Sequence, residues 1–412
     1  MAACADPADI HLGVKMDIVS RDKLVADVEA FCQEVRPVED LCYLEHRFND
    51  QAIELARKHR ILGLNVPVAY GGRGADLRTY VDALARIGRE GTGVRTLFSG
   101  HCSIGQTVLI EWGSEEQKRR VLPETAAGRA IMAFGLTEPE AGSNPREMQM
   151  TYRREGDRFL LNGVKYLISN GSIADLIVVF AYPEPTGDPA ADKARRFSAF
   201  LVATDQEGIE REMMTAKVGL PTSDTSMFEL TDYPVPVGNL LGAEGQGLTI
   251  AMQTLRAGRL SVAAGCLGVI EDCLEEACAY AKERSQHGKQ IARHQLVQEH
   301  IATIELARQA SESLIHTAAD AKQAAYENPG DAALMARVDL LVAEAKLFAS
   351  DAAFRAADSA MQVFGGRGYS ELFRPGRHWK DVRVCRIYEG TDEILKLKVA
   401  AGVLGKEYEA YR

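Results

Sequence analysis

The first third of the chain has the apolar spacing of amphipathic helices. After residue 20, apolar side chains recur at intervals of three and four positions: Leu24, Val25, Val28 and Phe31. That interval places them on one face of a helix. The same periodicity predicts a helix over 77–87, and the more apolar run 94–112 predicts a buried one. We therefore expect a helical region up to about residue 128.

The pattern changes between residues 129 and 240. Short runs rich in β-branched or aromatic residues occur at 131–134, 148–152, 159–161, 177–181 and 200–203. Pairs such as Asn162-Gly163 and Asn170-Gly171 separate them and are typical of turns. Many short strands at this spacing predict a β-sandwich or barrel.

Long helical patterns return from residue 241 onward. They cover about 248–285, 294–326, 332–364 and 392–404. Long helices with short links predict a bundle of four antiparallel helices. The predicted fold class is therefore mainly α with a central β domain. Its parts are an N-terminal helical domain at 1–128, a middle β domain at 129–240 and a C-terminal four-helix bundle at 241–412.

Composition narrows the classes of partner. The chain has 412 residues, a formal net charge of −10, and 46% hydrophobic and 26% charged residues. This is an ordinary globular composition, and its sign argues against a nucleic-acid surface. The longest apolar stretch, 176–182, is too short to cross a bilayer, and Asp6 and Asp9 argue against a secretory signal. Eight cysteines without a C-x-x-C pair, and no metal-ligand motif, indicate a cytoplasmic protein with reduced thiols and no metal.

The most distinctive chemistry lies near the C-terminus. Residues 387–394 read Ile-Tyr-Glu-Gly-Thr-Asp-Glu-Ile, and 364–369 read Phe-Gly-Gly-Arg-Gly-Tyr. Glu389 is a lone carboxylate beside Gly390 in an apolar neighbourhood. Burial raises the pKa of a carboxylate and a small neighbour lets a substrate approach, so the pattern suits a proton acceptor. The alternative is an acidic residue at a helix start, where the helix dipole favours negative charge.

The segment 387–394 resembles the C-terminal signature of the acyl-CoA dehydrogenase flavoproteins. A second segment, 134–144, reads Phe-Gly-Leu-Thr-Glu-Pro-Glu-Ala-Gly-Ser-Asn and is similar to the flavin-binding segment of that family. The two segments stand about 250 residues apart in the family's order, and the likeness extends from about residue 20 to 410. The resemblance implies FAD as cofactor and the order helical domain, β domain, helical bundle.

The resemblance also implies a set of flavin contacts. Thr137 follows an apolar strand, and Ser143 follows Gly142 in a turn whose amides can meet a phosphate. Ser169 keeps the hydroxyl of the second flavin strand, whereas Leu167 replaces the tryptophan that usually covers the ring. The full set implied by the resemblance is Phe134, Leu136, Thr137, Ser143, Leu167, Ser169, Arg284, Gln295, Gln362, Gly365, Gly366, Thr391 and Glu393.

In the family, a neighbouring subunit completes each flavin site, which implies a homo-oligomer, either a dimer or a tetramer. Arg284 matches an arginine that meets the flavin pyrophosphate, a task that suits a guanidinium. Gln295 and Gln362 match contacts to the adenosine half. For Arg284, an ordinary cation at a helix end remains an alternative.

The reaction implied by the resemblance is the α,β-dehydrogenation of an acyl-CoA thioester. Glu389 is the expected base for the α-proton, its backbone N–H the donor to the thioester oxygen, and flavin N5 the acceptor of the β-hydride. Gly390 permits the close fit and belongs with Glu389 to the catalytic group, and Tyr388 and Ser143 are expected to contact the substrate. Some relatives carry the base on the first long bundle helix, but the matching position here is Gly258, which cannot act as a base.

Arg256 and Arg259 are compatible with two carriers of the acyl group, coenzyme A or a carrier protein. Arg259 matches an arginine near the nucleotide end of coenzyme A, whereas Arg256 stands where the family often has an aspartate at the pantetheine arm. Because an arginine pair suits an acidic carrier protein, the alternative is an enzyme acting on a carrier-bound acyl or aminoacyl group in secondary metabolism. A non-catalytic flavoprotein scaffold is a further alternative. The expected electron acceptor is electron-transferring flavoprotein or oxygen.

Overall fold

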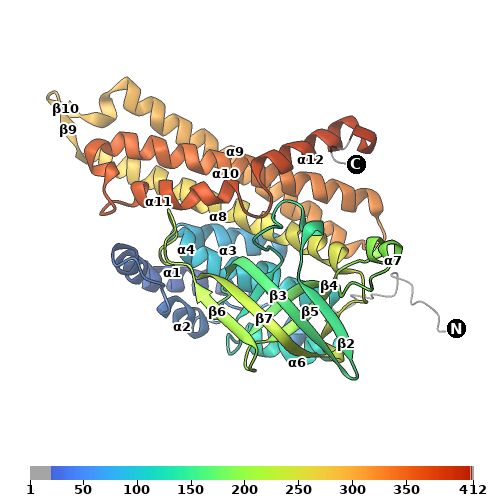
Figure 1. The fold of residues 1–412 in the computed structure, drawn as a ribbon. Helices are drawn as coiled ribbons and strands as arrows, with labels where there is room; N and C mark the ends of the chain where they lie inside the picture. The colour runs from blue at the N-terminus through green and yellow to red at the C-terminus, as the bar shows by residue number, and fades with distance from the viewer. Residues whose placement is uncertain (1–19, 409, 411–412) are drawn as a thin grey trace.

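The computed structural model describes residues 20–408 and 410. A long helical bundle lies across the top of the molecule, and the N-terminal helices and the β domain lie beneath it (Figure 1). This order of helical, β and helical parts confirms the predicted fold class. The expectation of no secretory signal concerns residues 1–19, which lie, like Cys4, outside the described residues. In the described part of the chain, no helix has the length and apolar character needed to cross a membrane.

The N-terminal region is a set of packed helices. They are α1 (Arg21–Leu44), α2 (Gln51–Lys58), α3 (Leu77–Gly88), α4 (Thr92–Phe98), α5 (Thr107–Trp112) and α6 (Glu115–Ala126). Leu24, Val28 and Phe31 are buried as the spacing predicts, whereas Val25 is half exposed. The segment between α4 and α5, Ser99–Gln106, is π-helical, so the predicted buried helix is one run with a wider middle. Such turns occur often at functional sites.

The β domain is a sheet that folds over its own core. Its strands are β1 (Met132–Gly135), β2 (Thr151–Glu155), β3 (Arg158–Ser169), β4 (Leu176–Pro183), β5 (Ser198–Ala203), β6 (Ile209–Met213), β7 (Thr225–Pro236) and β8 (Leu240–Leu241). They pair in the order β6-β7-β3-β2-β4-β5-β8, with β1 parallel to β4. Apolar residues from both halves, such as Phe159, Val179 and Phe228, share one core. A short helix, α7 (Pro189–Ala194), lies in the loop between β4 and β5.

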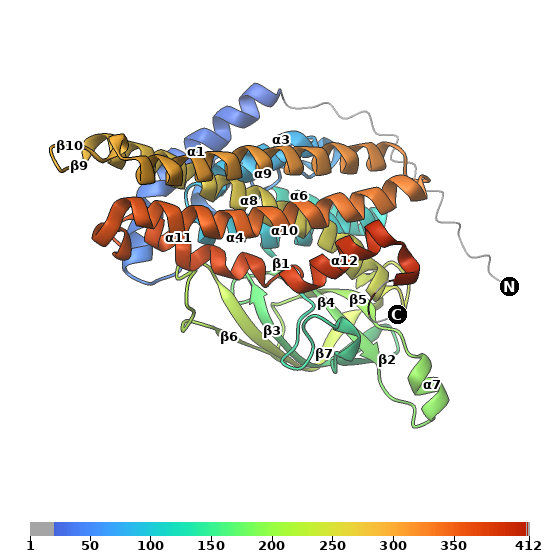
Figure 2. The same ribbon diagram turned by 90° about the horizontal axis from the view of Figure 1, so that it is seen from above.

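The C-terminal region has three long helices: α8 (Gly247–Glu283), α9 (Gln295–Glu327) and α10 (Ala332–Phe364). The two-residue strands β9 (Ser285–Gln286) and β10 (Lys289–Gln290) link α8 to α9. The predicted fourth helix, 392–404, is present as α12 (Asp392–Leu404), but it is short, and a helix that the sequence analysis did not predict, α11 (Arg374–Val382), shares the fourth place with it (Figure 2). The break between them arises because Glu389 and Gly390 have φ values of +56° and +98°, which no α-helix accommodates.

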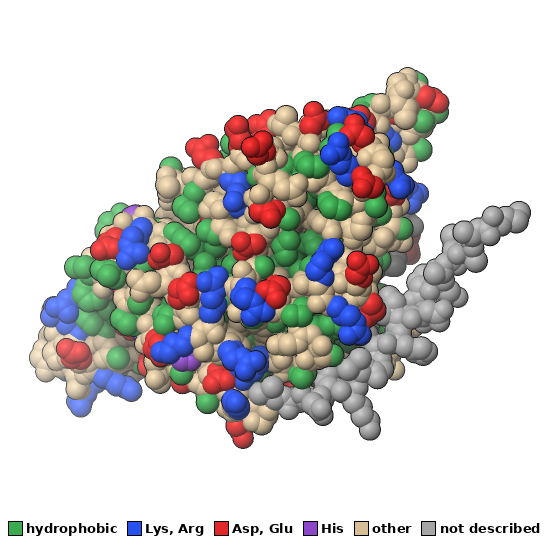
Figure 3. Space-filling view, turned by 90° about the horizontal axis from the view of Figure 1, so that it is seen from below, with side chains coloured by type: hydrophobic (Ala, Val, Ile, Leu, Met, Phe, Trp, Pro, Cys, Tyr) green, Lys and Arg blue, Asp and Glu red, His purple; other side chains and the backbone are tan. Residues whose placement is uncertain are grey.

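The surface mixes charges of both signs. On the face shown in Figure 3, lysines and arginines are interspersed with aspartates and glutamates. A mixed face does not create the single-sign field that nucleic-acid binding requires. The seven cysteines among the described residues are all free thiols.

Candidate active site

Glu389 lies in the turn between α11 and α12. A 3₁₀ turn, Arg383–Arg386, follows α11, and Thr391 caps α12 by accepting a hydrogen bond from the Ile394 N–H at 3.3 Å. Between these two features, Glu389 adopts a left-handed conformation, which is unfavourable for a residue with a Cβ. Such conformations persist only where the surroundings fix them, and they cluster at functional sites.

The carboxylate of Glu389 is buried against the backbone of α8. A methyl group added at Gly258 would lie 2.5 Å from both carboxylate oxygens, so only glycine leaves room for them. The Oε2 atom has no hydrogen-bond partner among the described residues. Burial raises the pKa of Glu389 to about 7 against the opposing effect of three nearby cations. A carboxylate with that pKa can gain and lose a proton near neutral pH, as a general base must.

The three cations near Glu389 are Arg95 of α4, Arg259 of α8 and Lys346 of α10, and all three are buried. Arg259 Nε donates to the Glu389 carbonyl at 2.9 Å, and Lys346 Nζ donates to the Gly390 carbonyl at 2.7 Å. Two helices therefore hold the left-handed turn in place. Sequence reasoning identified Arg259 but missed Arg95 and Lys346. The available signal for Arg95 was a lone cation within an apolar helical run.

Tyr388 joins this turn to α4. Its hydroxyl accepts a hydrogen bond from Arg95 and lies 3.1 Å from Cys385 Sγ. The Arg95 guanidinium also lies over the Tyr388 ring, 5.8 Å from the ring centroid. The predicted substrate-contacting tyrosine is therefore tied to a cation that the sequence did not single out.

The segment after β1 is fixed by a buried ion pair. Lys165 Nζ lies 2.7 Å from Glu138 Oε1, and both side chains are buried. Glu138 also accepts two backbone N–H groups, at 2.5 and 3.2 Å. The Tyr166 N–H donates to the Thr137 carbonyl at 2.9 Å. Thr137 is thus held at the end of β1, whereas Ser143 lies in an exposed loop.

A bulge in β3 exposes the apolar side chain of Leu167. The register of β3 against β7 shifts between Lys165 and Ile168, Leu167 has φ of +59°, and its side chain is 52% exposed. The hydroxyl residues Thr137 and Ser169 lie near it. An exposed apolar side chain beside two hydroxyls fits a flavin, whose flat ring is partly apolar and edged with hydrogen-bonding atoms.

Phe134 differs from its neighbours on β1. Its side chain is buried in the β-domain core, with its ring centroid 5.0 Å from that of Phe180, so only its backbone is available to a cofactor. Leu136 and Thr137 are partly exposed. The geometry therefore favours these two residues over the Phe134 side chain as flavin contacts.

The π-helical segment Ser99–Gln106 lies between the ends of β1 and β3 and the surroundings of Glu389. A methyl group at Gly100 would lie 3.7 Å from Ser169 Cβ. On the other side of the segment, Ser99 Oγ lies 3.1 Å from Ser261 Oγ of α8, one helical turn from Gly258. The residues expected to meet the flavin and the residues around Glu389 therefore flank the same buried segment.

Sequence models of three successive domains match the chain. The acyl-CoA dehydrogenase N-terminal domain matches residues 20–129, the middle domain residues 133–233 and the C-terminal domain residues 245–404. The chain belongs to the acyl-CoA dehydrogenase family. It is accordingly an oxidoreductase acting on CH–CH bonds, and the likeness seen in two short motifs covers most of the chain.

Individual relatives agree with this assignment. An acyl-CoA dehydrogenase of Bacillus subtilis is 36% identical over 393 residues, which are 95% of this chain and 99% of that protein. The structure of an acyl-CoA dehydrogenase from Bacillus anthracis complexed with FAD is 30% identical with a TM-score of 0.85, covering 94% of this chain and 67% of that chain. The structure of the prolyl acyl carrier protein oxidase AnaB is 27% identical with a TM-score of 0.83. The match covers 93% of this chain and 99% of that chain. FAD is thus bound by a relative, in agreement with the cofactor expected here.

A second group of residues assigned to FAD by the family resemblance lies elsewhere. The group consists of Arg284, Gln295, Gln362, Gly365 and Gly366, all exposed. Arg284 follows Gly258 by twenty-six positions along α8, which is roughly 39 Å at the rise of an α-helix. Tyr280 stacks on Phe364 at 4.3 Å, so the ends of α8 and α10 meet there. The β9–β10 end and the α12 end of the bundle are opposite each other (Figure 1), and one chain does not bring this group to Glu389.

Two further predicted contacts have partners within the chain. The Arg256 guanidinium binds the Asp339 carboxylate through Nε at 2.5 Å and Nη2 at 3.1 Å. Such a bidentate pair satisfies both ions, so Arg256 is a weaker anchor for an acidic carrier than its sequence position indicates. Thr391 uses its hydroxyl to cap α12, and Glu393 is exposed in the first turn of that helix.

Proposed function

We propose that the protein catalyses the FAD-dependent α,β-dehydrogenation of an acyl thioester, with Glu389 as the base. The observation that carries the proposal is the buried Glu389 carboxylate, with its pKa near 7 and its unpartnered oxygen. A simple helix-start role is disfavoured because Thr391, and not Glu389, caps α12, while the Glu389 carboxylate lies against α8.

The residues around Glu389 have different roles in the proposed reaction. Burial makes the carboxylate ready to take up the weakly acidic α-proton, while the nearby cations keep part of it ionised beforehand. The bonds from Arg259 and Lys346 fix the turn, so that the Glu389 N–H is a preorganised donor for the thioester oxygen as negative charge develops on it. Glycine suits position 390 because its φ of +98° is unfavourable for a residue with a Cβ, which would also lie 3.2 Å from Leu395 Cδ2. FAD, when bound, supplies the acceptor for the β-hydrogen, which leaves as hydride.

We also infer that a functional site needs two copies of the chain. The flavin ring fits Leu136, Thr137, Leu167 and Ser169, whereas the group around Arg284 is roughly 39 Å from Gly258 along α8. A single FAD is too short to span that distance together with the site at Glu389. The distal group of one copy would therefore complete the flavin site of another, in a dimer or a tetramer.

Coenzyme A is the favoured handle for the acyl group. Arg256 is neutralised by Asp339, which weakens the case for an acidic carrier protein. A carrier-bound acyl or aminoacyl substrate remains the second candidate, because the carrier protein oxidase AnaB shares the fold over 93% of this chain. Electron-transferring flavoprotein, with oxygen as the alternative, is the proposed acceptor of the electrons.

The variant Glu389→Gln tests the base, because it keeps the side-chain shape and removes the ionisable group. We expect its FAD content to match the wild type, and its anaerobic flavin reduction by an acyl-CoA substrate to be about 10²- to 10⁴-fold slower. Glu207→Gln, at an exposed position between β5 and β6, is the matched control and should react at the wild-type rate.

Two results would contradict the proposal. Reduction of the Glu389→Gln flavin at the wild-type rate would remove Glu389 as the base. A wild-type protein that binds FAD but is reduced by no acyl-CoA and no acyl carrier protein would instead favour the scaffold alternative.

A further inference from the structure

Lys165 of β3 and Glu138, in the turn after β1, form an ion pair inside the β domain. The lysine side chain is 0% exposed and the glutamate side chain 4%, and Nζ lies 2.7 Å from Oε1. Burial outweighs the attraction of Glu138 and lowers the pKa of Lys165 to about 8, so the ammonium form predominates at neutral pH. A buried ion pair gives little net stability, because each ion loses its water. Stability alone therefore does not account for the pair.

The ammonium group of Lys165 also fixes the peptide group that precedes Thr137. Its Nζ donates a hydrogen bond to the Leu136 carbonyl at 3.3 Å. A peptide group is planar and trans, so its C=O and N–H bonds point in opposite directions. Because the Leu136 carbonyl is turned toward the buried lysine, the Thr137 N–H points away from it.

A second hydrogen bond fixes the peptide group that follows Thr137. The Tyr166 N–H donates to the Thr137 carbonyl at 2.9 Å. Strand β3 therefore holds the peptide groups on both sides of the Thr137 Cα, one through the side chain of Lys165 and the other through its own backbone. The orientation of these two planes sets the direction of the Cα–Cβ bond and with it the region that the Thr137 hydroxyl can reach.

Glu138 extends this restraint to the loop that carries Ser143. Its carboxylate accepts the N–H groups of Gln149 and Met150 at 2.5 and 3.2 Å. Its backbone forms a turn with Ala141, in which each N–H donates to the other residue's carbonyl, at 3.0 and 3.2 Å. Both ends of the loop are thus attached to one ion pair, although Ser143 itself is exposed.

We propose that Lys165 and Glu138 are positioning residues for FAD: they set the backbone of Thr137 and the loop of Ser143 for cofactor binding without touching the cofactor. This inference rests on the proposed flavin contacts at Leu136 and Thr137, and it does not depend on which residue is the base. A backbone that is fixed before the cofactor arrives does not have to be ordered by it, and this raises the affinity. A pair that served only the fold would not affect the FAD affinity of a folded variant.

A single and a double variant separate positioning from stability. Lys165→Met leaves the Glu138 carboxylate buried and unpaired, so both the stability and the FAD affinity should fall. Lys165→Met/Glu138→Gln removes both charges, while the glutamine oxygen can still accept the Gln149 and Met150 N–H groups. We expect the double variant to recover most of the lost stability. Its Kd for FAD should nevertheless stay about 10-fold above the wild-type value, because the Leu136 carbonyl has lost its charged donor.

The measurements use the full-length holoenzyme. Stepwise dilution, followed by the fluorescence of released FAD, gives the Kd. The urea midpoint by far-UV circular dichroism, with FAD in equal excess, gives the stability, and size-exclusion chromatography checks that the assembly is unchanged. Lys322→Met is the matched control, because Lys322 is a buried lysine of α9 whose Nζ lies 3.9 Å from the Glu111 carboxylate. We expect the control to bind FAD with the wild-type Kd.

Three results would overturn the inference. The first is a folded double variant that binds FAD with the wild-type Kd, which would make the pair a structural feature only. The second is a double variant that does not fold, since the fold itself would then require the pair. The third is an equal rise of the Kd in Lys322→Met, because the effect would then follow from the loss of any buried lysine. If Lys165→Met does not fold, the double variant still decides.

Anaerobic reduction by thioesters separates this inference from the proposed function. A wild-type holoenzyme that no thioester reduces would contradict the proposed function, whereas a raised Kd in the double variant would still support the positioning role. Conversely, a wild-type Kd in the double variant, together with rapid reduction of the wild-type flavin by an acyl-CoA, would overturn only the positioning role.

Discussion

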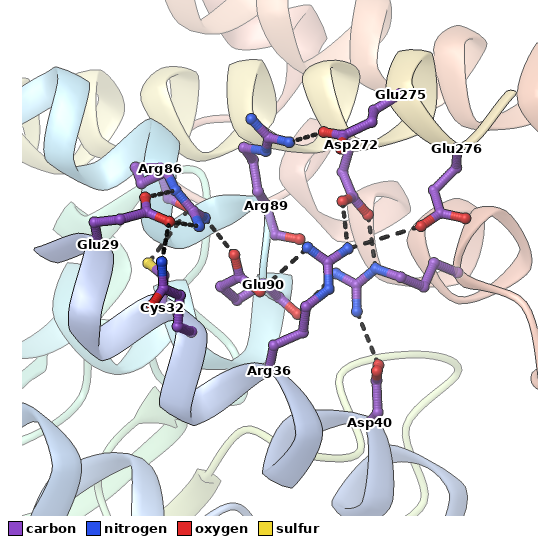
Figure 4. A network of polar contacts seen from close by, with 12 residues as sticks. Glu29, Cys32, Arg36, Asp40, Arg86, Arg89, Glu90, Asp272, Glu275 and Glu276 are labelled. Atoms are coloured by element: carbon purple, nitrogen blue, oxygen red, sulfur yellow. Dashed lines mark hydrogen bonds and ion pairs between the residues drawn. The ribbon is translucent and has the colours of Figure 1, made fainter. Parts of the chain in front are cut away.

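Two buried clusters of charge differ in how completely their ions are paired. In the first, where α1, α8 and α11 meet, Asp272 accepts hydrogen bonds from Arg36 at 2.7 Å, from Arg374 at 2.7 Å and from His378 at 2.8 Å. Arg374 also reaches Asp40, at 2.8 Å. Figure 4 shows how this network continues to Arg86 on α3 and to Glu90 in the turn that follows α3. Each arginine in it has at least one carboxylate within 4.0 Å.

In the second cluster, around Glu389, two cations have no carboxylate within 4.0 Å among the residues that the structure describes. Arg95 bonds a tyrosine hydroxyl and Lys346 bonds a backbone carbonyl. The pKa values differ accordingly. Although burial acts to raise it, the neighbouring cations hold the pKa of Asp272 well below its ordinary value, whereas burial raises that of Glu389 to about 7. Complete pairing is what stable burial of charge requires, and incomplete pairing indicates a place for a ligand.

The largest expected difference between the clusters is in stability. Asp272→Asn removes the carboxylate that accepts hydrogen bonds from Arg36, Arg374 and His378. We expect the free energy of unfolding to fall by about 3–5 kcal/mol, measured by urea denaturation at pH 7. Flavin reduction per folded molecule should remain near the wild-type rate. A loss of less than about 1 kcal/mol in the free energy of unfolding would contradict the stabilising role of the Asp272 cluster.

Gly258→Ala disturbs the second cluster and should affect chemistry more than stability. The added methyl group meets both Glu389 oxygens at 2.5 Å, so the carboxylate must move. A displacement of about 1 Å at a reacting group costs on the order of 100-fold in rate. Anaerobic stopped-flow reduction measures this loss, with FAD content as the control. An unchanged rate would show that the position of the carboxylate on α8 does not matter for the reaction.

The pH dependence of flavin reduction sharpens the comparison further. Glu389 accepts a proton only when ionised, so the rate should rise with pH through about 7. Lys346→Met removes a cation that favours the carboxylate form, so the pKa of Glu389 and the midpoint of the profile should move upward by on the order of one pH unit. The midpoint is read from the reduction rate between pH 5 and 9. A downward shift would exclude Lys346 as a charge acting on Glu389.

The smallest expected effect concerns Asp381, at the edge of the paired network. Burial raises its pKa to about 7, against hydrogen bonds from the Leu220 N–H and the Tyr43 hydroxyl. The folded protein therefore keeps a proton that the unfolded chain releases near pH 4. The stabilisation that the protonated Asp381 carboxyl gives the folded state is complete below about pH 4 and is lost as the pH rises toward 7.

Asp381→Asn should remove that loss, because an amide oxygen accepts the same hydrogen bonds without ionising. We expect the variant to gain on the order of 1 kcal/mol relative to the wild type between pH 5 and pH 8. Urea denaturation at the two pH values measures the change. A constant difference between variant and wild type at both pH values would contradict a raised pKa for Asp381.

Local patterns were sufficient to predict much of the fold. Apolar spacing predicted α8 to α10 to within a few residues, because a helix repeats its contacts every three to four positions. β-branched runs between turn pairs likewise predicted β1 to β5, whereas β6, β7 and β8 were not predicted. The fourth predicted helix is present as α12, but α11 was not predicted. Helical periodicity also does not report the left-handed turn at Glu389 and Gly390 that lies between them.

For the site, the sequence by itself determined which residue types are present: a lone glutamate beside glycine, hydroxyls at the ends of two strands, and arginines on the first long bundle helix. Only the tertiary structure decided which of them meet. It brought Glu389 onto Gly258 across 131 positions of sequence, engaged Arg256 with Asp339, and separated Arg284 from Glu389. It also buried Arg95, which has no carboxylate partner within the described part of the chain. Burial, pairing and distance are properties of neighbours in space, and the chain order that fixes a helix does not state them.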